Sequence, residues 1–282
     1  MLQPRYLLHT GEGDRFGEAV HHIDVYAFDS LGIYRKMFRD KGAHLKNGYR
    51  MPIDLPEGKW TFLCLGGKVG DYEIGIFKTG IPQQFSPAVS PGITTLSDFR
   101  VKAYFEQKEN LEYSFGELFF GRLDSVEITA DNGGTGVVDL MKNTNKIEVR
   151  VKGIADGSSA RITSDNGRFN SENVTPADAG TIYVPYYSAS QADDTRVFQF
   201  DVLRLYTDGH LFLKLLNPDG TDVIPGFTKD LINAIMSSPA YHTQEDLDRE
   251  DTYLIELVLS KDGVIISLRV NGWETVSTTP EV

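Results

Sequence analysis

The stretch Leu55-Pro56-Glu57-Gly58-Lys59-Trp60-Thr61-Phe62-Leu63-Cys64-Leu65-Gly66-Gly67 decides the fold. Pro56 presets φ for the second position of a type I turn and Gly58 suits the fourth, so the chain reverses here. In the strand that follows, successive side chains point to opposite faces, and nearly all of them are apolar from Trp60 to Leu65. We therefore predict a central strand that is buried on both faces.

Composition limits the class of protein. With 282 residues, the chain is long enough for one large or two ordinary domains, and 40% hydrophobic and 24% charged residues are ordinary for a globular protein. The net charge of −12 disfavours binding to nucleic acid or anionic lipid. Cys64 is the only cysteine, which excludes an intramolecular disulfide and a cysteine metal cluster. No apolar run approaches the roughly 20 residues that span a bilayer.

Strand signals follow on both sides of the central strand. Val25–Phe28 and Ile33–Phe38 read as a hairpin around Asp29-Ser30-Leu31-Gly32. Further hairpins are predicted for Phe198–Tyr206 with Leu211–Leu215 and for Tyr253–Leu259 with Val264–Val270. The sequence therefore indicates a mainly β protein.

The chain divides into two β-rich parts. Ala130–Gly136 holds three glycines and no large apolar side chain, so we expect it to connect two domains, residues 1–133 and 134–282. The one helix that the pattern predicts is Lys229–Ser237 in the second domain, where Thr228 could cap its start and Pro239 follows its end. The acidic run Gln244–Asp251 is interpreted as a solvated charge run.

No signature of catalysis, of a cofactor or of a metal site stands out. His22 and Asp24 share one face of a strand at a spacing that suits a metal ligand pair, but no third ligand is near, and we interpret them as a solvent-facing strand edge. Gly66-Gly67-Lys68 lacks the spacing of a phosphate-binding loop, and no Gly-x-Ser-x-Gly motif occurs. We therefore expect no enzyme.

Several segments, taken in order, resemble one protein family. They are Val25–Asp29, Leu55–Phe62, Glu117–Gly121, Asn145–Val149, Val202–Leu205 and Val270–Glu274. Their order and spacing from about Phe16 to Trp273 resemble the fimbrillin-type subunits of Bacteroides-like bacteria, in particular the FimB-type family of minor, membrane-anchoring fimbrial subunits. The resemblance implies two tandem transthyretin-like β-sandwich domains, with one short helix in the second, and neither catalysis nor a cofactor.

The resemblance also implies a location and partners. The family is exported as lipoproteins to the outer membrane and the cell surface, where its members join other fimbrial subunits in an adhesive fibre. The lipid-bearing cysteine is absent from this sequence, so a lipid anchor N-terminal to Met1 is an expectation. Signal-directed secretion and a role in cell adhesion follow from the same resemblance.

Fibres of this class assemble by strand exchange, in which an incoming strand pairs with an open sheet edge and fills an apolar groove. The candidate strand-exchange segment is Arg5, Tyr6, Leu7, Leu8, His9 and Thr10, which carries three apolar residues ahead of a glycine-rich break. The tail from Trp273 to Val282 is a second, weaker candidate, because it is short and polar. We therefore expect an anchoring or terminating subunit.

A surface glycan-binding lipoprotein of the same bacteria is the alternative function. Tyr183, Tyr186 and Tyr187 beside Pro185 could stack on sugar rings, although we favour packing in the core or at the edge of the sandwich as the explanation of these aromatic residues. A glycosidase with two carboxylates on a β-sandwich is a more distant alternative.

Overall fold

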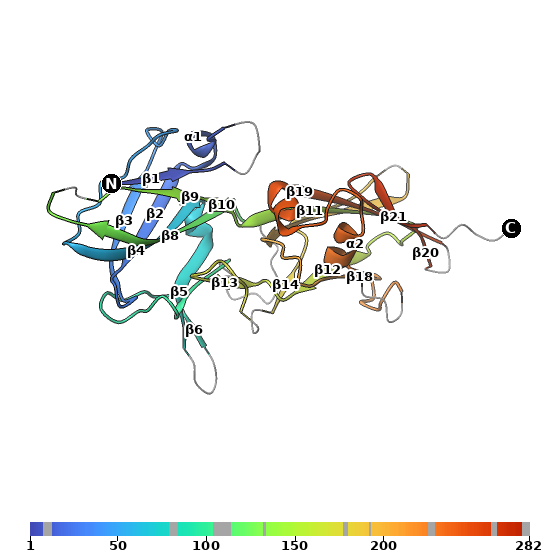
Figure 1. Ribbon diagram of the computed structural model, residues 1–282. Helices are drawn as coiled ribbons and strands as arrows, with labels where there is room; N and C mark the ends of the chain where they lie inside the picture. Colours follow the sequence, from blue (N-terminus) through green and yellow to red (C-terminus); the bar gives the residue numbers. More distant parts are fainter. Residues whose placement is uncertain are drawn as a thin grey trace. The chain divides into compact units, whose positions relative to one another are not determined.

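The computed structural model describes residues 1–7, 13–78, 84–103, 114–131, 134–176, 180–191, 193–224, 229–260 and 264–277. These residues form two compact units (Figure 1). Unit 1 comprises those of Met1–Tyr104, Phe115–Asn143 and Arg168–Pro176, and unit 2 those of Phe105–Ser114, Thr144–Gly167 and Ala177–Val282. The predicted mainly β class is confirmed, and the paired sheets of each unit fit β-sandwich domains. The transthyretin-like topology stays a prediction.

Unit 1 contains three sheets. Its strands are β1 (Leu2–Arg5), β2 (His22–Phe28), β3 (Tyr34–Lys41), β4 (Gly58–Gly67), β5 (Tyr72–Lys78), β6 (Gln84–Ser86), β7 (Phe99–Ala103), β8 (Leu118–Ile128), β9 (Gly136–Asp139), β10 (Met141–Lys142) and β13 (Arg168–Asn170). The sheet orders are β10-β8-β4-β2-β3, β13-β7-β5-β6 and β1-β9. A short helix, α1 (Phe16–Ala19), and a 3-10 turn, η1 (Val69–Asp71), complete the described elements of this unit.

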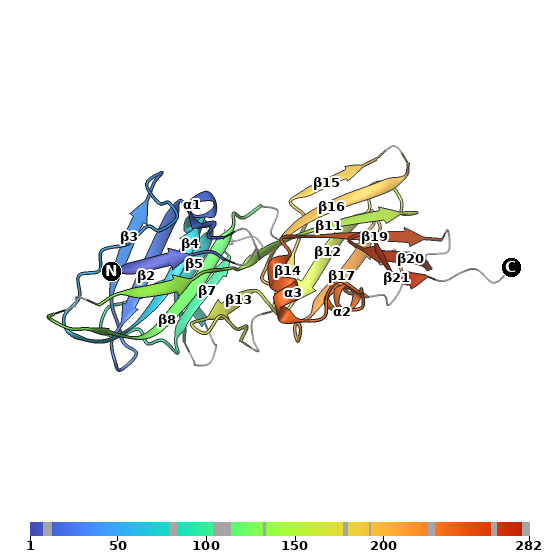
Figure 2. The same cartoon turned by 45° about the horizontal axis from the view of Figure 1, so that its top comes forward.

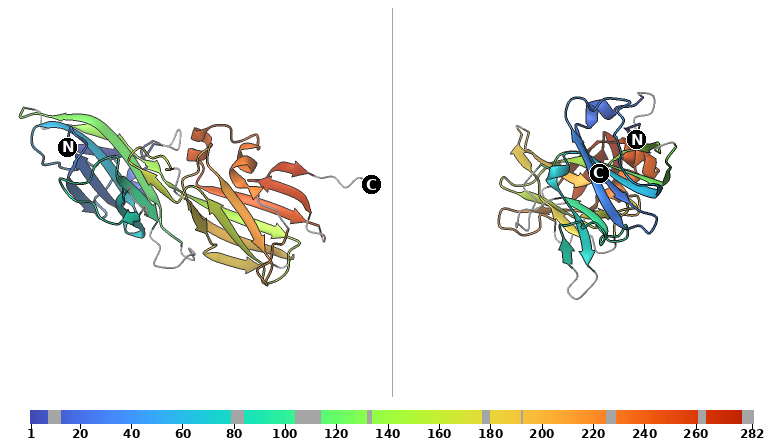
Figure 3. Two further views of the ribbon diagram at one scale, coloured as in Figure 1. Left: turned by 90° about the horizontal axis from the view of Figure 1, so that it is seen from below. Right: turned by 90° about the vertical axis from the view of Figure 1, so that its left-hand side faces the viewer.

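Unit 2 contains two sheets, which Figures 2 and 3 show from three directions. Its strands are β11 (Thr144–Lys152), β12 (Ser159–Ser164), β14 (Thr181–Tyr183), β15 (Tyr187–Ser190), β16 (Thr195–Leu203), β17 (Leu211–Leu216), β18 (Lys229–Asp230), β19 (Thr252–Leu259), β20 (Ile265–Val270) and β21 (Trp273–Ser277). The sheet orders are β15-β16-β11-β19-β20-β21 and β14-β12-β17-β18. Two helices, α2 (Leu231–Met236) and α3 (Gln244–Arg249), belong to this unit.

The strand β4 is central, as the sequence predicts. It lies between β2 and β8, and its side chains from Phe62 to Leu65 are at most 1% exposed. Phe62 and Cys64 face the core that the N-terminal segment also joins. Burial raises the pKa of the Cys64 thiol to about 12, so this cysteine is a core side chain and not a nucleophile.

One predicted hairpin is wrong. The strands β16 and β17 are joined by a short turn but belong to different sheets of unit 2. Side chains take the backbone hydrogen bonds that a hairpin partner would take at the end of β16. The Asn166 amide donates to the carbonyl oxygens of Leu203 and Arg204, and the Leu203 N–H donates to the Tyr183 hydroxyl. The chain therefore leaves one sheet and enters the other.

The helices differ from the single predicted one. The predicted helix Lys229–Ser237 is present as α2, but it begins at Leu231 with Asp230 as its N-cap, and Thr228 lies outside the described residues. The acidic run forms α3, which the sequence interpretation missed. A capping box of Thr243 and Asp246 fixes the start of α3, and the buried Leu247 anchors it. No helix of the described part of the chain is long and apolar enough to cross a membrane.

The units differ from the predicted ranges 1–133 and 134–282. The chain passes from unit 1 to unit 2 between Asn143 and Thr144, after β9 and β10. It then returns to unit 1 for residues 168–176, where β13 pairs antiparallel with β7. A boundary drawn from a glycine-rich stretch misses both features, because the pairing partners of β9 and β13 are distant in sequence.

Candidate functional site

The candidate site is the N-terminal strand β1 and the groove of unit 1 that it fills. β1 pairs in parallel with β9 in a two-stranded sheet (Figure 1), from Leu2 opposite Gly136 to Arg5 opposite Asp139. On its other side, Leu2 exchanges two backbone hydrogen bonds with Met51, of 3.0 and 2.8 Å. Among the described strands, β1 therefore has one full partner, β9, and only a single bridge on its other side.

Alternate side chains of this segment enter the core. Leu2 is 2% exposed, Pro4 is buried, and Tyr6 is 4% exposed, whereas the residues between them face outward. The Tyr6 ring meets the Phe119 ring edge-on, with 4.8 Å between centroids. Each large apolar side chain buried in this way stabilises the fold by roughly 1.5–3 kcal/mol. The segment therefore acts as a plug for the core as well as a strand.

The side-chain hydrogen bonds of the described part of this segment lie at its C-terminal end. The Arg5 guanidinium donates two hydrogen bonds to the Asp139 carboxylate, of 2.9 and 3.1 Å. These side chains are 36% and 59% exposed, so solvent screening leaves the ion pair little net effect on stability. The Tyr6 N–H donates to Asp14, and the Tyr6 carbonyl accepts from the Arg15 N–H. Apolar burial and backbone hydrogen bonds therefore hold the segment more than charge does.

Two glycines allow β9 to approach its neighbours closely. A Cβ on Gly121 of β8 would lie 2.7 Å from Val138 and 2.8 Å from Leu140. A Cβ on Gly136 would lie 2.5 Å from Leu123 and 3.2 Å from Leu2. The close crossing of β8 and β9 sets the position of the strand that β1 pairs with.

The described part of the predicted exchange segment lies in this site. Arg5 ends β1, Tyr6 is in the core, and Leu7 is 39% exposed. Leu8, His9 and Thr10 lie outside the described residues, and the role of all six in strand exchange stays a prediction. Of the second candidate, the tail, β21 is described to Ser277, and residues 278–282 are outside the description.

The segment predicted from the sequence began at Arg5 and left out the buried residues Leu2 and Pro4. Leu2, Pro4 and Tyr6 alternate with polar residues, and that period of two was the available signal. No local signal marks the partner residues Val138 and Leu140, because the parallel pairing joins positions 134 residues apart in the chain.

The interpretation of His22 and Asp24 as a solvent-facing strand edge is wrong. They lie on β2, between β3 and β4, and the Asp24 carboxylate has no exposed surface. It accepts two hydrogen bonds of 2.6 Å from Arg39, the cross-strand partner on β3, and lies 2.9 Å from His22 Nε2. The Asp24 carboxylate therefore binds Arg39 and His22 inside unit 1 and does not face solvent. The described residues contain no group of three or more side chains that could hold a metal.

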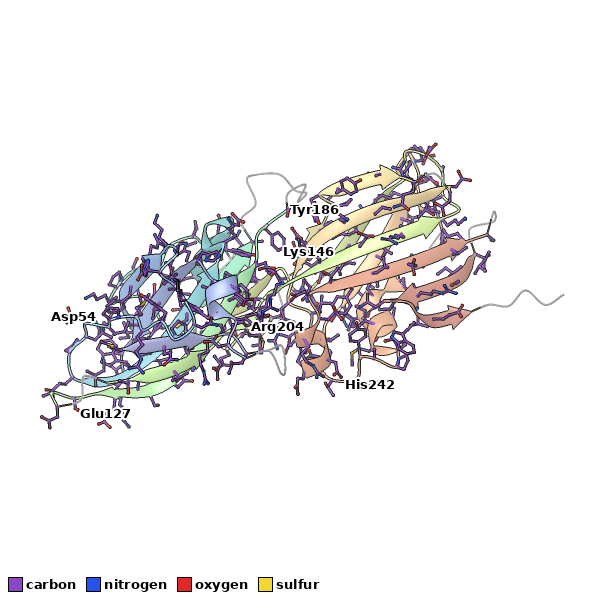
Figure 4. All side chains as sticks on the ribbon, turned by 90° about the horizontal axis from the view of Figure 1, so that it is seen from above. Asp54, Glu127, Lys146, Tyr186, Arg204 and His242 are labelled. Carbon is purple, nitrogen blue, oxygen red and sulfur yellow. The ribbon has the colours of Figure 1, made fainter. Side chains whose placement is uncertain are left out.

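The predicted tyrosine platform does not form as one surface. Tyr183 is 1% exposed, and its hydroxyl takes part in the hydrogen-bond network that ends β16. Tyr186 is half-buried, and Tyr187 on β15 is 49% exposed (Tyr186 is labelled in Figure 4). A sugar platform that needs Tyr183 is excluded by its burial.

The sequence model of one family, the fimbrillin-A associated anchor proteins Mfa1 and Mfa2, matches residues 1–279. The chain belongs to this family. It is a family of fimbrial anchor proteins and not of enzymes. No match is found among curated proteins.

Solved structures share the whole fold. A candidate polysaccharide-binding protein of Bacteroides thetaiotaomicron has 22% identity and a TM-score of 0.80, over 99% of this chain and 97% of that one. The fimbrial anchor protein Mfa2 of Porphyromonas gingivalis has 20% identity and a TM-score of 0.78, over 98% of both chains. A candidate adhesin of Bacteroides ovatus has 20% identity and a TM-score of 0.75, over 97% and 93%. At these identities the likeness concerns the fold.

Proposed function

We propose that this chain is a minor or membrane-anchoring subunit of a fimbrium, and that it joins a neighbouring subunit by β-strand exchange at the β1 site. Membership of the fimbrial anchor family over residues 1–279 is the observation that carries the proposal. The family supports a cell-surface fimbrium, association with other fimbrial subunits and a role in cell adhesion. The geometry of the β1 site supports the strand-exchange part of the proposal.

Departure of β1 would open a groove with two properties that suit an incoming strand. The backbone N–H groups of Gly136 and Leu140 would lose their acceptors, the carbonyl oxygens of Met1 and Arg5. The core would lose the side chains of Leu2 and Tyr6 and expose Phe119. A second strand with the same alternation of apolar residues satisfies both requirements, which is the general logic of recognition by strand addition.

Anchoring to the outer membrane is the second part of the proposal. The protein would be exported as a lipoprotein, with its lipid on a residue N-terminal to the present sequence. The anchor description of the family supports this arrangement. Mass spectrometry of the protein purified from its native host would detect the lipid, and a protein without any lipid would contradict this part.

A disulfide lock tests strand exchange directly. Gln3 and Val137 are partners in the β1–β9 register and face outward, so the double variant Gln3→Cys/Val137→Cys can cross-link the two strands. We expect the oxidised variant to lose co-purification with its fimbrial partner in the native host, and reduction to restore it. Cys64 is buried and does not compete for the bond.

The matched control is a lock in the other parallel pair of the described strands, Arg150→Cys/Glu256→Cys between β11 and β19 of unit 2. It should leave the association with the partner unchanged in both redox states. Equal association of the oxidised and reduced Gln3→Cys/Val137→Cys protein would show that β1 does not need to move, and would contradict strand exchange at this site.

A further inference from the structure

A groove of about 570 Å³ opens to solvent in unit 1, beside the turn that leads into β4. We call it the Trp60 groove; its lining residues are Asp29, Arg35, Lys36, Asp54, Leu55, Pro56 and Trp60. Its volume lies within the roughly 300–1,000 Å³ of small-molecule sites. None of these residues pairs with β1 through the backbone, although Trp60 and Leu55 pack in the same core as Leu2. The groove is therefore open to a ligand while β1 is in place.

A β-bulge brings two cations to the groove. In the β2–β3 pair, Ala27 lies opposite Lys36 and Phe28 lies opposite Tyr34, so Arg35 is an extra residue without a partner. Neighbours on a regular strand point to opposite faces, whereas a bulge redirects one of them. Arg35 and Lys36 therefore both line the same groove although they are adjacent in sequence.

The polar wall is fixed before any ligand binds. Arg35 Nε donates a hydrogen bond of 2.6 Å to Asp29, whose other oxygen accepts from the N–H groups of Leu31 and Ile33. Partial burial acts to raise the pKa of Asp29, but these hydrogen bonds outweigh it and lower the pKa. Among the described residues, the two terminal nitrogens of the Arg35 guanidinium have no recorded hydrogen-bond acceptor. They are positioned donors that a ligand could use.

The opposite wall is apolar and equally fixed. The Trp60 indole N–H donates a 3.1 Å hydrogen bond to the Pro56 carbonyl, which holds the ring against Leu55 and Pro56. Pro56 is exposed, Leu55 is half-buried, and an edge of Trp60, 6% of the residue, reaches the surface. Lys36 Nζ donates to the Asp54 carbonyl, and the Asp54 carboxylate is fully exposed (Figure 4).

We propose that the Trp60 groove binds a neutral sugar ring of a polysaccharide. A pyranose has an apolar C–H face that suits the Leu55, Pro56 and Trp60 wall, and hydroxyl groups that both donate and accept hydrogen bonds. Arg35 and Lys36 supply donors, and Asp54 supplies an acceptor. The two carboxylates and two cations cancel, so the groove has no net charge to select an ion. Because the groove is open, both ends of a sugar chain can extend from it.

Affinity electrophoresis in gels containing yeast mannan, laminarin, xyloglucan or polygalacturonate tests the proposal. We expect at least one of the three neutral polysaccharides to retard the protein. The double variant Arg35→Gln/Lys36→Gln should bind that polysaccharide about tenfold more weakly, because hydrogen bonds to charged groups are lost. The control Lys41→Gln/Lys46→Gln also removes two exposed cations from unit 1 and should bind like the wild type.

Fluorescence adds a readout at the groove itself. The sequence has two tryptophans, so the variant Trp273→Phe leaves Trp60 as the single emitter. Addition of the retained polysaccharide should shift its emission. Equal weakening in both double variants, an unchanged Trp60 emission, retention by polygalacturonate alone, or no retention by any of the four gels would each overturn the proposal. None of these outcomes affects the strand-exchange test, which uses a different partner and a different site.

Discussion

Gly121 is one of the two glycines that allow β9 to approach its neighbours closely. The variant Gly121→Val would place side-chain atoms against Val138, Leu140 and the Asp139 carbonyl, all within 2.9 Å of the Cβ position. Overpacking of this kind costs about 1–3 kcal/mol. We expect that loss in the free energy of unfolding, measured by urea titration.

The control for Gly121 is Gly70→Ala. Gly70 has no atom within 4 Å of its Cβ position and does not need a positive φ, so its substitution should change stability by less than about 0.5 kcal/mol. Equal effects at the two glycines would contradict the close crossing of β8 and β9.

The Asp24–Arg39 pair predicts an asymmetry between its two partners. The Asp24 side chain is fully buried, whereas the Arg39 side chain is 51% exposed and can turn to water. Arg39→Gln leaves a buried carboxylate without its main partner and should cost about 3–5 kcal/mol, whereas Asp24→Asn should cost about 1–3 kcal/mol. Thermal unfolding of the two variants measures the difference, and Lys152→Gln in the exposed Lys152–Asp193 pair is the neutral control. A larger loss in Asp24→Asn would contradict this account.

His210 gives a prediction about pH. Its Nδ1 donates a 3.0 Å hydrogen bond to Asp230, which raises the pKa of His210 above its ordinary value of 6.5. A histidine whose pKa is higher in the folded than in the unfolded state stabilises the fold fully at pH values below its unfolded-state pKa. This contribution is lost as the pH rises through its folded-state pKa. An NMR titration should place the His210 midpoint above 6.5 in the wild type and lower in Asp230→Asn. An identical midpoint would exclude Asp230 as the cause.

At the scale of elements, the N-terminal segment should be separable from the rest of unit 1. A chain without residues 1–7 loses the buried Leu2 and Tyr6 side chains, and large-to-small core changes cost roughly 2–5 kcal/mol each. We expect a lower melting temperature, and a synthetic peptide of residues 1–10 should restore it. A peptide with serine at positions 2 and 6 is the control. An unchanged melting temperature without the segment would show that β1 does not support the core.

Local pattern predicted the elements whose partners are local or whose burial is complete. The β2–β3 and β19–β20 pairs and the buried strand β4 follow from alternation, turn residues and apolar runs. The break between β16 and β17 was not predictable in this way, because Asn166 and Tyr183, far away in sequence, take the backbone hydrogen bonds there. The sequence of α3 contains a capping box that could have indicated a helix. It has one buried apolar residue, Leu247, and lacks the apolar stripe by which helices are usually predicted.

In the whole molecule, the features that the sequence did not predict depend on pairing between segments that are distant in the chain. The parallel pairs β1–β9 and β11–β19 and the return of residues 168–176 to unit 1 join segments distant in the chain. The resemblance to fimbrial subunits supplied the family, which the match over residues 1–279 confirms. The contribution of β9 to the candidate site was not predicted from the sequence and is seen only in the structure.

Strand exchange at the β1 site would put another subunit's strand in the place of β1 in the assembled fimbria. The most direct measurement introduces a photoreactive amino acid at Val137, which is 43% exposed and lies opposite Gln3 on β9. Fimbriae are then irradiated in the native host and the cross-linked peptides identified by mass spectrometry, with Phe212 of unit 2 as the control position. We predict cross-links from position 137 to a segment of a different subunit. Cross-links confined to residues 1–7 of the same chain would contradict strand exchange at this site.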